Sequence, residues 1–150
     1  MTRLLQLTIA ALLVAAPAAA QTWQIDPAHS RAQFTVRHMG ISNIRGDFGA
    51  VTGTVEFDGK DVTKAKVNAS IAVDSISTRV AKRDEHLKTD DFLDAANHPT
   101  MSFVSTSIAP AGPGKYRMTG NLTIRGTTKE VTSDLDAPSG PVTANGGTRM

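Results

Sequence analysis

The sequence contains no cysteine, so no disulfide bond stabilises the fold. Aromatic residues are also scarce, at 5% of the chain, and the apolar interior must therefore be mainly aliphatic. Neither sign of charge is in large excess, because the sequence has 16 Lys and Arg residues and 14 Asp and Glu residues. Such a balanced surface gives no electrostatic basis for binding nucleic acid. Stability must come from apolar burial and backbone hydrogen bonds.

The start of the chain has the pattern of a secretory signal peptide over residues 1–20. Arg3 gives a basic start, an apolar run follows, and small residues precede a cleavage site at Gln21. The apolar run is shorter than the roughly 20 residues that a spanning helix needs, so we expect no transmembrane span after cleavage. We therefore predict a periplasmic or secreted protein with one domain over residues 21–150.

Alternation of apolar and polar residues dominates this domain and predicts β-strands. The clearest case runs from Ala65 to Val73, where every second residue is apolar. Other predicted strands, after a short lead-in at 23–25, cover residues 30–38, 51–57, 101–104, 116–125 and 131–135. Because no helices alternate with these strands, we expect a mainly all-β, antiparallel fold.

Three glycines are expected to fall inside strands: Gly49, Gly53 and Gly120. Glycine in a strand marks either a bend that curls a sheet into a barrel or a flexible strand of a sandwich, and the sequence leaves both open. Residues 138–150 are rich in Pro, Gly and Thr and predict a loop. Small ligand-holding barrels have about eight strands, more than the alternation provides. We therefore expect an incomplete barrel whose last strands are missing after Met150.

One charged segment, at about 78–95, breaks the alternation with helix-forming residues and predicts a short helix. At about 100° per residue, Val80 and Leu87 share one arc, which predicts a seat on the sheet or on a barrel mouth. The neighbouring arc is cationic and contains Arg79, Lys82, Arg83 and His86. Geometry alone favours a solvated basic stripe, offset by the Asp84–Lys88 pair, over a site for an anionic group.

Candidates for catalysis are few. The histidines are His29, His38, His86 and His98, and none has the HxH or HxxxH spacing of paired metal ligands. The sequence also lacks a nucleophile elbow, so we predict no catalytic residue, no metal and no cofactor. Two alternatives stay open. One is an envelope enzyme or metal protein that uses His29, His38, His86 or Asp84, and the other is an envelope interaction or stress module that binds no ligand.

Six short motifs occur in order between Trp23 and Val131. They are Trp23-x-Ile25-Asp26-x-x-His29-Ser30, Phe34-x-Val36-x-His38, Arg83-Asp84-x-His86-Leu87, Asp91-Phe92-x-Asp94, Pro99-x-Met101-x-Phe103 and Gly120-x-Leu122-Thr123-Ile124-x-Gly126-x-Thr128. Together they make the chain resemble the YceI-like family. The resemblance implies an extended, lipocalin-like barrel of antiparallel strands, a periplasmic or secreted homodimer, and an apolar lumen for a long isoprenoid or similar amphiphilic lipid.

This resemblance leads us to predict a non-enzymatic protein that carries an isoprenoid or fatty-chain lipid. The predicted lumen residues are Phe34, Val36, Val67, Ile71, Val73, Met101, Phe103, Met118, Leu122 and Ile124. Alternation shows which of them share a face, but not that this face is the lumen. Arg83 and His86 are the candidates for contact with a polar head group, with the 78–95 segment covering one end of the barrel.

Overall fold

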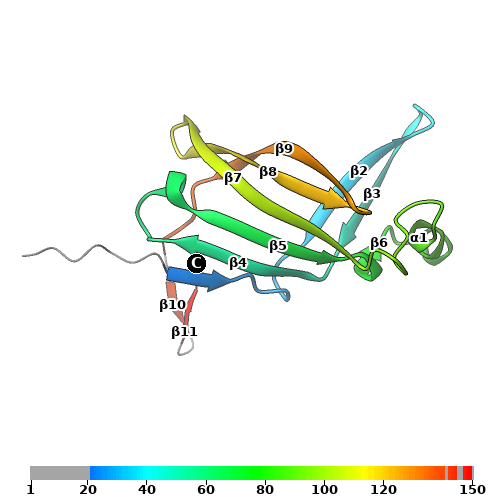
Figure 1. Cartoon of the computed structure of the whole chain (residues 1–150), viewed down its shortest axis with the longest axis horizontal. Helices are drawn as coiled ribbons and strands as arrows, with labels where there is room; N and C mark the ends of the chain where they lie inside the picture. Colours follow the sequence, from blue (N-terminus) through cyan, green and yellow to red (C-terminus); the bar gives the residue numbers. More distant parts are fainter. Residues whose placement is uncertain (1–20, 141, 145–146, 150) are drawn as a thin grey trace, which may run out of the picture.

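The computed structural model describes residues 21–140, 142–144 and 147–149, and the predicted signal peptide at 1–20 lies outside them. Every strand pairing in this part of the chain is antiparallel, which confirms the predicted mainly all-β, antiparallel fold. Most strands belong to one curved sheet, and a hairpin and a short helix lie at one of its ends (Figure 1). No helix in the described ranges is both long and apolar enough to cross a membrane.

The large sheet has the strand order β1-β4-β5-β7-β8-β9. Its strands are β1 (Gln21–Gln24), β4 (Val51–Phe57), β5 (Lys66–Ala72), β7 (Thr100–Gly112), β8 (Lys115–Ile124) and β9 (Thr127–Asp136). Alternation predicted five of the six, and β1 was expected only as a short lead-in at 23–25. Strand β7 continues eight residues beyond the predicted end at 104. The pairing of β7 with β8 shifts between Ser105 and Ser107, and this bulge breaks the two-residue period that the sequence pattern depends on.

Glycine is required at two points of the large sheet. Gly53 has φ +138°, and a Cβ there would collide with the backbone oxygen of Asn68 on the paired strand. A Cβ at Gly120 would collide with the ring of Phe103, which lies over this glycine. Gly120 also pairs with Ser105 at the edge of the bulge, which favours a bend over a flexible sandwich strand, the two alternatives that the sequence left open. Gly49 lies between two strands rather than inside one.

A small sheet contains β2 (Ala32–His38), β3 (Ser42–Phe48) and β6 (Ile76–Ser77), in the order β2-β3-β6. The sequence predicted β2 but missed β3, because a glycine occupies one of its apolar positions. A Cβ at Gly46 would collide with the ring of Phe34, so the aromatic ring on the paired strand fills the place of the missing side chain. The partner residue supplies the apolar surface that the pattern of β3 lacks.

The chain beyond Ser139 is not wholly a loop. Strands β10 (Val142–Ala144) and β11 (Gly147–Arg149) form an antiparallel hairpin, so the loop predicted for 138–150 is wrong for these residues. Within the described residues β9 pairs only with β8, and β2 pairs only with β3. The sheets therefore do not close into a barrel, as expected.

The helical segment is shorter than predicted. The helix α1 covers Ala81–Lys88, and the rest of the predicted 78–95 segment is extended chain or turns. Leu87 packs on the core as predicted, but Val80 is the N-cap residue and is 46% exposed, so the predicted Val80–Leu87 seat is wrong. Tight turns after the helix bring Leu93 and Ala95 onto the same core cluster, and these residues take the place of Val80.

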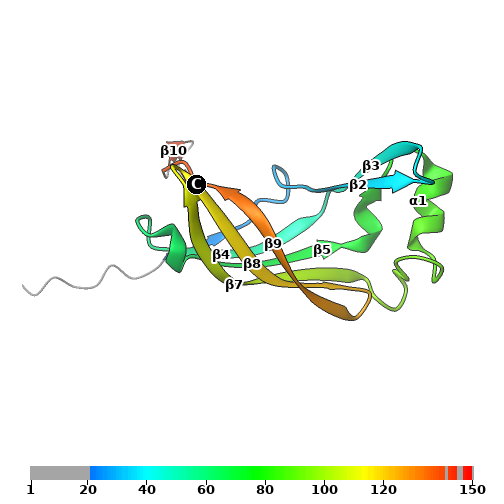
Figure 2. The same cartoon turned by 90° about the horizontal axis from the view of Figure 1, so that it is seen from above.

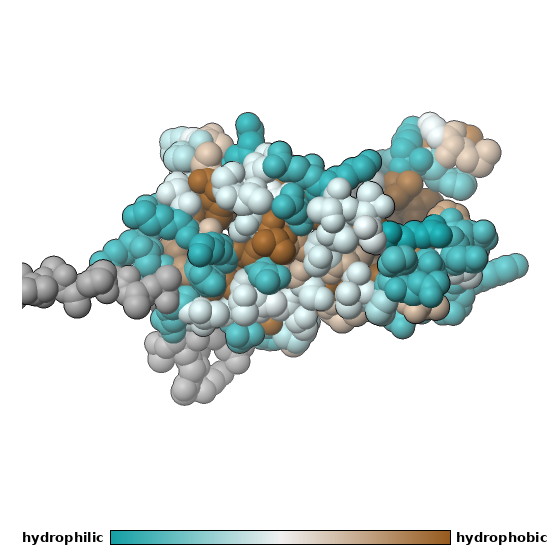
Figure 3. Space-filling model, in the orientation of Figure 1, coloured by the Kyte–Doolittle hydropathy of each residue, from teal (hydrophilic) through white to brown (hydrophobic). Residues whose placement is uncertain are grey.

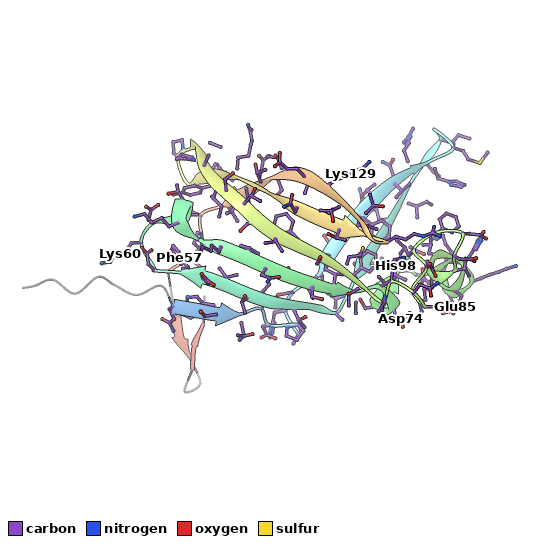
Figure 4. All side chains as sticks on the ribbon, in the orientation of Figure 1. Phe57, Lys60, Asp74, Glu85, His98 and Lys129 are labelled. Atoms are coloured by element: carbon purple, nitrogen blue, oxygen red, sulfur yellow. The ribbon has the colours of Figure 1, made fainter. Side chains whose placement is uncertain are left out.

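The apolar core is divided between the two ends of the large sheet. The helix-end cluster contains Phe48, Val73, Ile76 and Met101, with Phe34, Leu87 and Leu93 packed against it. The far-end cluster contains Phe57, Val62 and Ile108. Val62 belongs to the short 3-10 helix η1 (Val62–Lys64), and Val73 to the 3-10 helix η2 (Val73–Ser75). In Figure 4, Phe57 and Lys60 mark the far end, and Asp74, Glu85 and His98 mark the helix end.

Candidate functional site

The large sheet has one continuous apolar face. Directly paired residues of antiparallel strands point to the same face of the sheet. The pairs Ile71–Met101 and Phe103–Leu122 therefore show that apolar residues of β5, β7 and β8 point to one common face. The two-residue period then adds Val67, Met118 and Ile124 to this face. Seven of the predicted lumen residues therefore lie on one face of the large sheet: Val67, Ile71, Met101, Phe103, Met118, Leu122 and Ile124.

This face is concave. Trp23 lies on β1 and Leu135 on β9, which are the opposite edges of the large sheet. Both side chains nevertheless pack on the far-end cluster, which requires the sheet to curl around it. Figure 2 shows the curvature from above, with β2 and β3 on the concave side of the large sheet, whereas Figure 3 shows the outer side, where polar and neutral surface surrounds small apolar patches. We call this surface the concave face.

The far end of the concave face contains a groove of about 340 Å³. Its walls are mostly aliphatic and include Val55, Val67, Ile108 and Leu135. Asp136 lies at its polar rim, where it accepts a hydrogen bond of 2.6 Å from Lys115 on the neighbouring strand. This contact raises the pKa of Lys115 above its ordinary value. The groove thus joins an apolar floor to a rim that carries an ion pair.

Three predicted lumen residues lie elsewhere. Val73 is in η2 and only 1% exposed, so it is a core residue of the helix end. Phe34 and Val36 belong to the small sheet, where Phe34 packs against Phe48 with ring centroids 5.5 Å apart and Val36 is 53% exposed. Met101 is on the concave face but only 4% exposed, since the helix-end cluster covers it.

Arg83, one of the two head-group candidates, is occupied within the protein. Its Nε donates to the hydroxyl of Thr78 at 2.7 Å, and an Nη donates to the Thr78 carbonyl at 2.9 Å. Asp84 completes the network by accepting hydrogen bonds from the Thr78 backbone N–H at 2.8 Å and from its hydroxyl at 2.5 Å. We call these three residues the Thr78 clamp.

His86, the other head-group candidate, is exposed on α1. Its ring lies 3.1 Å from an Asp91 oxygen and meets the ring of Phe92 edge-on, with centroids 5.0 Å apart. Phe92 is itself exposed, although its carbonyl accepts a hydrogen bond from Arg125 in the β8–β9 turn. Neither head-group candidate lines the apolar groove.

The other histidines occupy separate places. His29 pairs with Asp26 at 2.8 Å, His38 ends β2, and His98 packs against Gly126 in the β8–β9 turn. Within the described ranges, no three His, Asp or Glu side chains are grouped closely enough to hold a metal ion.

Several site residues were missed in the sequence. The strand pattern at 51–57 placed Val55 on an apolar face, and the pattern at 131–135 included Leu135, yet only the order of strands in the sheet brings these two side chains to one groove. A second cavity, of about 520 Å³, lies between the β2–β3 hairpin and the chain after β6. Its lining contains Arg45, which the sequence did not mark, and Arg79, which was placed on the cationic arc of the predicted helix but lies before α1.

Comparison with known proteins finds one matching family and relatives of similar sequence. A family described as the YceI-like domain matches residues 23–148. A UPF0312 protein from Shewanella denitrificans is 41% identical over 125 residues, which are 82% of this chain and 65% of that protein. The chain thus spans a little under two thirds of the length of this relative.

Solved structures show the same fold. BcnA from Burkholderia cenocepacia has a TM-score of 0.69 at 29% identity, over 77% of this chain and 73% of that one. A polyisoprenoid binding domain from Saccharophagus degradans, implicated in plant cell wall breakdown, has a TM-score of 0.51 at 12% identity, over 82% and 67% of the two chains. At that identity the likeness is one of fold alone.

Proposed function

Because this chain belongs to the YceI-like family, we propose that it binds a long-chain isoprenoid or related amphiphilic lipid and is not an enzyme. The observation that carries the proposal is the concave face, whose middle is apolar and is covered by neither core cluster. Val67, Phe103 and Leu122 lie there, outside both clusters and only partly buried. The fold shared with the S. degradans polyisoprenoid binding domain is compatible with this class of ligand.

The chemistry of the concave face fits an aliphatic chain. Its side chains are Val, Ile, Leu and Met with a single Phe, so they match a flexible chain better than a flat ring. Burial of one methylene contributes about 0.8 kcal/mol, and one five-carbon isoprene unit therefore roughly 3–4 kcal/mol. Observed binding free energies end near −20 kcal/mol, so burial of every unit of a long isoprenoid would exceed this limit. The cost of association offsets part of the gain, and burial of part of the chain is enough for tight binding.

We further propose that the protein acts as a homodimer in the periplasm or outside the cell. Export is supported by the signal-peptide pattern at residues 1–20. A lipid carrier in an aqueous compartment shields the isoprenoid chain from water while the head group stays accessible. Carriage of this kind needs no catalytic residue and no cofactor.

The direct test is to purify the protein from its host, extract it with organic solvent and identify the extracted molecules by mass spectrometry. We expect a long-chain isoprenoid or related lipid in amounts close to one per protein chain. A folded, lipid-free protein that also fails to take up added isoprenoids would contradict the proposal and favour an envelope interaction module. Turnover of a substrate, abolished by substitution of His29 or His86 in a folded protein, would favour the enzyme instead.

A matched pair of variants locates the bound chain. Leu122→Gln places an amide on the concave face, whereas Asn121→Gln adds a methylene to the exposed opposite face of the same strand. We expect Leu122→Gln to weaken isoprenoid binding by about tenfold, the cost of one poorly solvated amide. Asn121→Gln should bind like the wild type. Fluorescence of Trp23, the single tryptophan, reports binding because its ring packs on the far-end cluster.

A further inference from the structure

The polar cavity beside the small sheet has the composition of an anion site. It has a volume of about 520 Å³, and its walls come from β2, β3 and the chain at β6 (Figure 1). Arg45 and Arg79 supply two guanidinium groups, and Gln33, Thr35 and Ser77 supply neutral hydrogen-bond donors. Guanidinium and hydroxyl groups together are the donors that recognise phosphate-type oxyanions.

Positive charge in this cavity is not neutralised by the protein. Asp47 is the one carboxylate in the walls, and it already pairs with Arg31 at 3.0 Å. Within the described part of the chain, the side chains of Arg45 and Arg79 make no hydrogen bond or ion pair. Two cationic groups therefore face a space that contains no opposing free carboxylate.

The Thr78 clamp holds one wall of this cavity in place. Thr78 lies between Ser77 and Arg79, is 5% exposed and is bound on both its backbone and its hydroxyl by Asp84 and Arg83. Arg79 has φ +64°, an unusual conformation for a residue with a side chain. The buried clamp thus fixes the backbone from which the Arg79 side chain starts.

We propose that this cavity binds a phosphate-type oxyanion, with Arg45 and Arg79 as the charged ligands and with Arg83 and Asp84 as positioning residues. The proposal does not require lipid binding on the concave face, because the cavity lies at the opposite end of the large sheet from the apolar groove. The anion has two sources with the same chemistry, free phosphate and the head group of a phosphorylated amphiphile. The experiment separates them.

The test titrates three probes into the purified protein at low ionic strength: inorganic phosphate, farnesyl monophosphate and farnesol. Calorimetry gives the affinities, and amide NMR shifts locate the binding site. We expect phosphate to shift the amides of Gly46 and Ser77. Arg45→Gln and Arg79→Gln should each lower the affinity for the phosphorylated probes about tenfold, the scale of one charge-assisted hydrogen bond. The matched control is Arg117→Gln, an exposed arginine on the outer face of β8.

Each result decides a separate point. Farnesyl monophosphate that binds more tightly than both other probes identifies a lipid head group as the anion, whereas equal binding of the two phosphates identifies a free anion. Farnesol that binds with unchanged affinity in both arginine variants separates this cavity from the concave face. Absence of phosphate binding, or equal losses in Arg117→Gln, would overturn the oxyanion site. Failure of farnesol alone would count against the proposed lipid function and leave the phosphate result to decide this one.

Discussion

The two ends of the large sheet are built in different ways. The far end uses the large sheet and η1 alone: β1, β4, β7, β8, β9 and η1 surround Phe57, Val62 and Ile108, and no residue of the small sheet takes part. The helix end is assembled from both sheets, α1 and the turns after it, with the Thr78 clamp and an arginine-lined cavity beside its core. One end is held by the apolar alternation of one sheet, and the other by packing between two sheets and a helix with a buried polar network beside it.

This contrast assigns different roles to apolar and polar groups. At the far end, apolar side chains both pack the core and leave a groove open, so packing and the proposed lipid binding use the same kind of surface. At the helix end, the apolar cluster is closed and the open space is polar. Substitutions at the two ends should therefore separate stability from binding.

The largest expected effect is on the large sheet, at Gly53→Ala. The new Cβ would collide with the Asn68 backbone, and φ +138° is accessible only to glycine. We expect a loss of about 3–5 kcal/mol in the free energy of unfolding, measured by urea titration. The control is Gly49→Ala, where a Cβ meets nothing within 4 Å, and its stability should stay within about 0.5 kcal/mol of the wild type. Similar losses in both variants would refute the steric explanation.

Met101 and Leu122 test whether the concave face is divided between packing and binding. Met101 is buried under the helix-end cluster, so Met101→Ala should cost about 2–4 kcal/mol of stability. Leu122 lies in the uncovered middle, and Leu122→Ala should cost less than about 1.5 kcal/mol because less surface is lost. Lipid affinity should follow the reverse order. Equal stability losses would show that the middle of the face is packed core.

The Thr78 clamp should give an intermediate effect. Asp84→Ala removes the acceptor of two Thr78 hydrogen bonds, and leaving these donors unpaired should cost about 1–3 kcal/mol. It should also reduce the preference of the protein for farnesyl monophosphate over farnesol, which a purely structural role would leave unchanged. Asp84→Asn keeps an acceptor oxygen and should restore much of both properties. Glu85→Ala is the control, because Glu85 is exposed and its carboxylate forms an ion pair with Lys88 on the helix surface.

The sequence was sufficient for features that repeat along the chain. Two-residue alternation predicted five strands of the large sheet and the side of its own strand on which Phe103 or Leu122 lies. Features that depend on a partner were missed. The apolar position of β3 at Gly46 is filled by the Phe34 ring, and no pattern within β3 records it.

The helix end shows the same limit in its polar residues. Arg83 became a head-group candidate through the family resemblance, although its cationic arc alone favoured a solvated stripe, and the structure shows its donors bound to Thr78. Arg45 was not singled out, because only the pairing of β3 with β6 brings it to the cavity that also contains Arg79. The sequence shows which charged side chains are present, whereas the path of the backbone decides which of them are bound within the protein and which line a cavity.

The smallest expected effect is a pH dependence confined to the far end. The backbone N–H groups of Asp61 and Lys60 donate to Asp58 and lower the pKa of its carboxyl below the ordinary value. A lowered folded-state pKa stabilises the protein above the unfolded value, near pH 4, and this stabilisation is lost as the pH falls toward the folded value.

Asp58→Asn keeps the shape of this turn but removes the titrating group. Its urea midpoint should therefore fall less steeply than that of the wild type as the pH decreases below about 4. The matched control is Asp90→Asn at the helix end, where Asp90 is exposed in the turn after α1 and has no side-chain partner in the described ranges. Its midpoint should follow the wild type at every pH. If the two variants respond alike, the hydrogen-bonded turn at Asp58 does not distinguish the far end from the helix end.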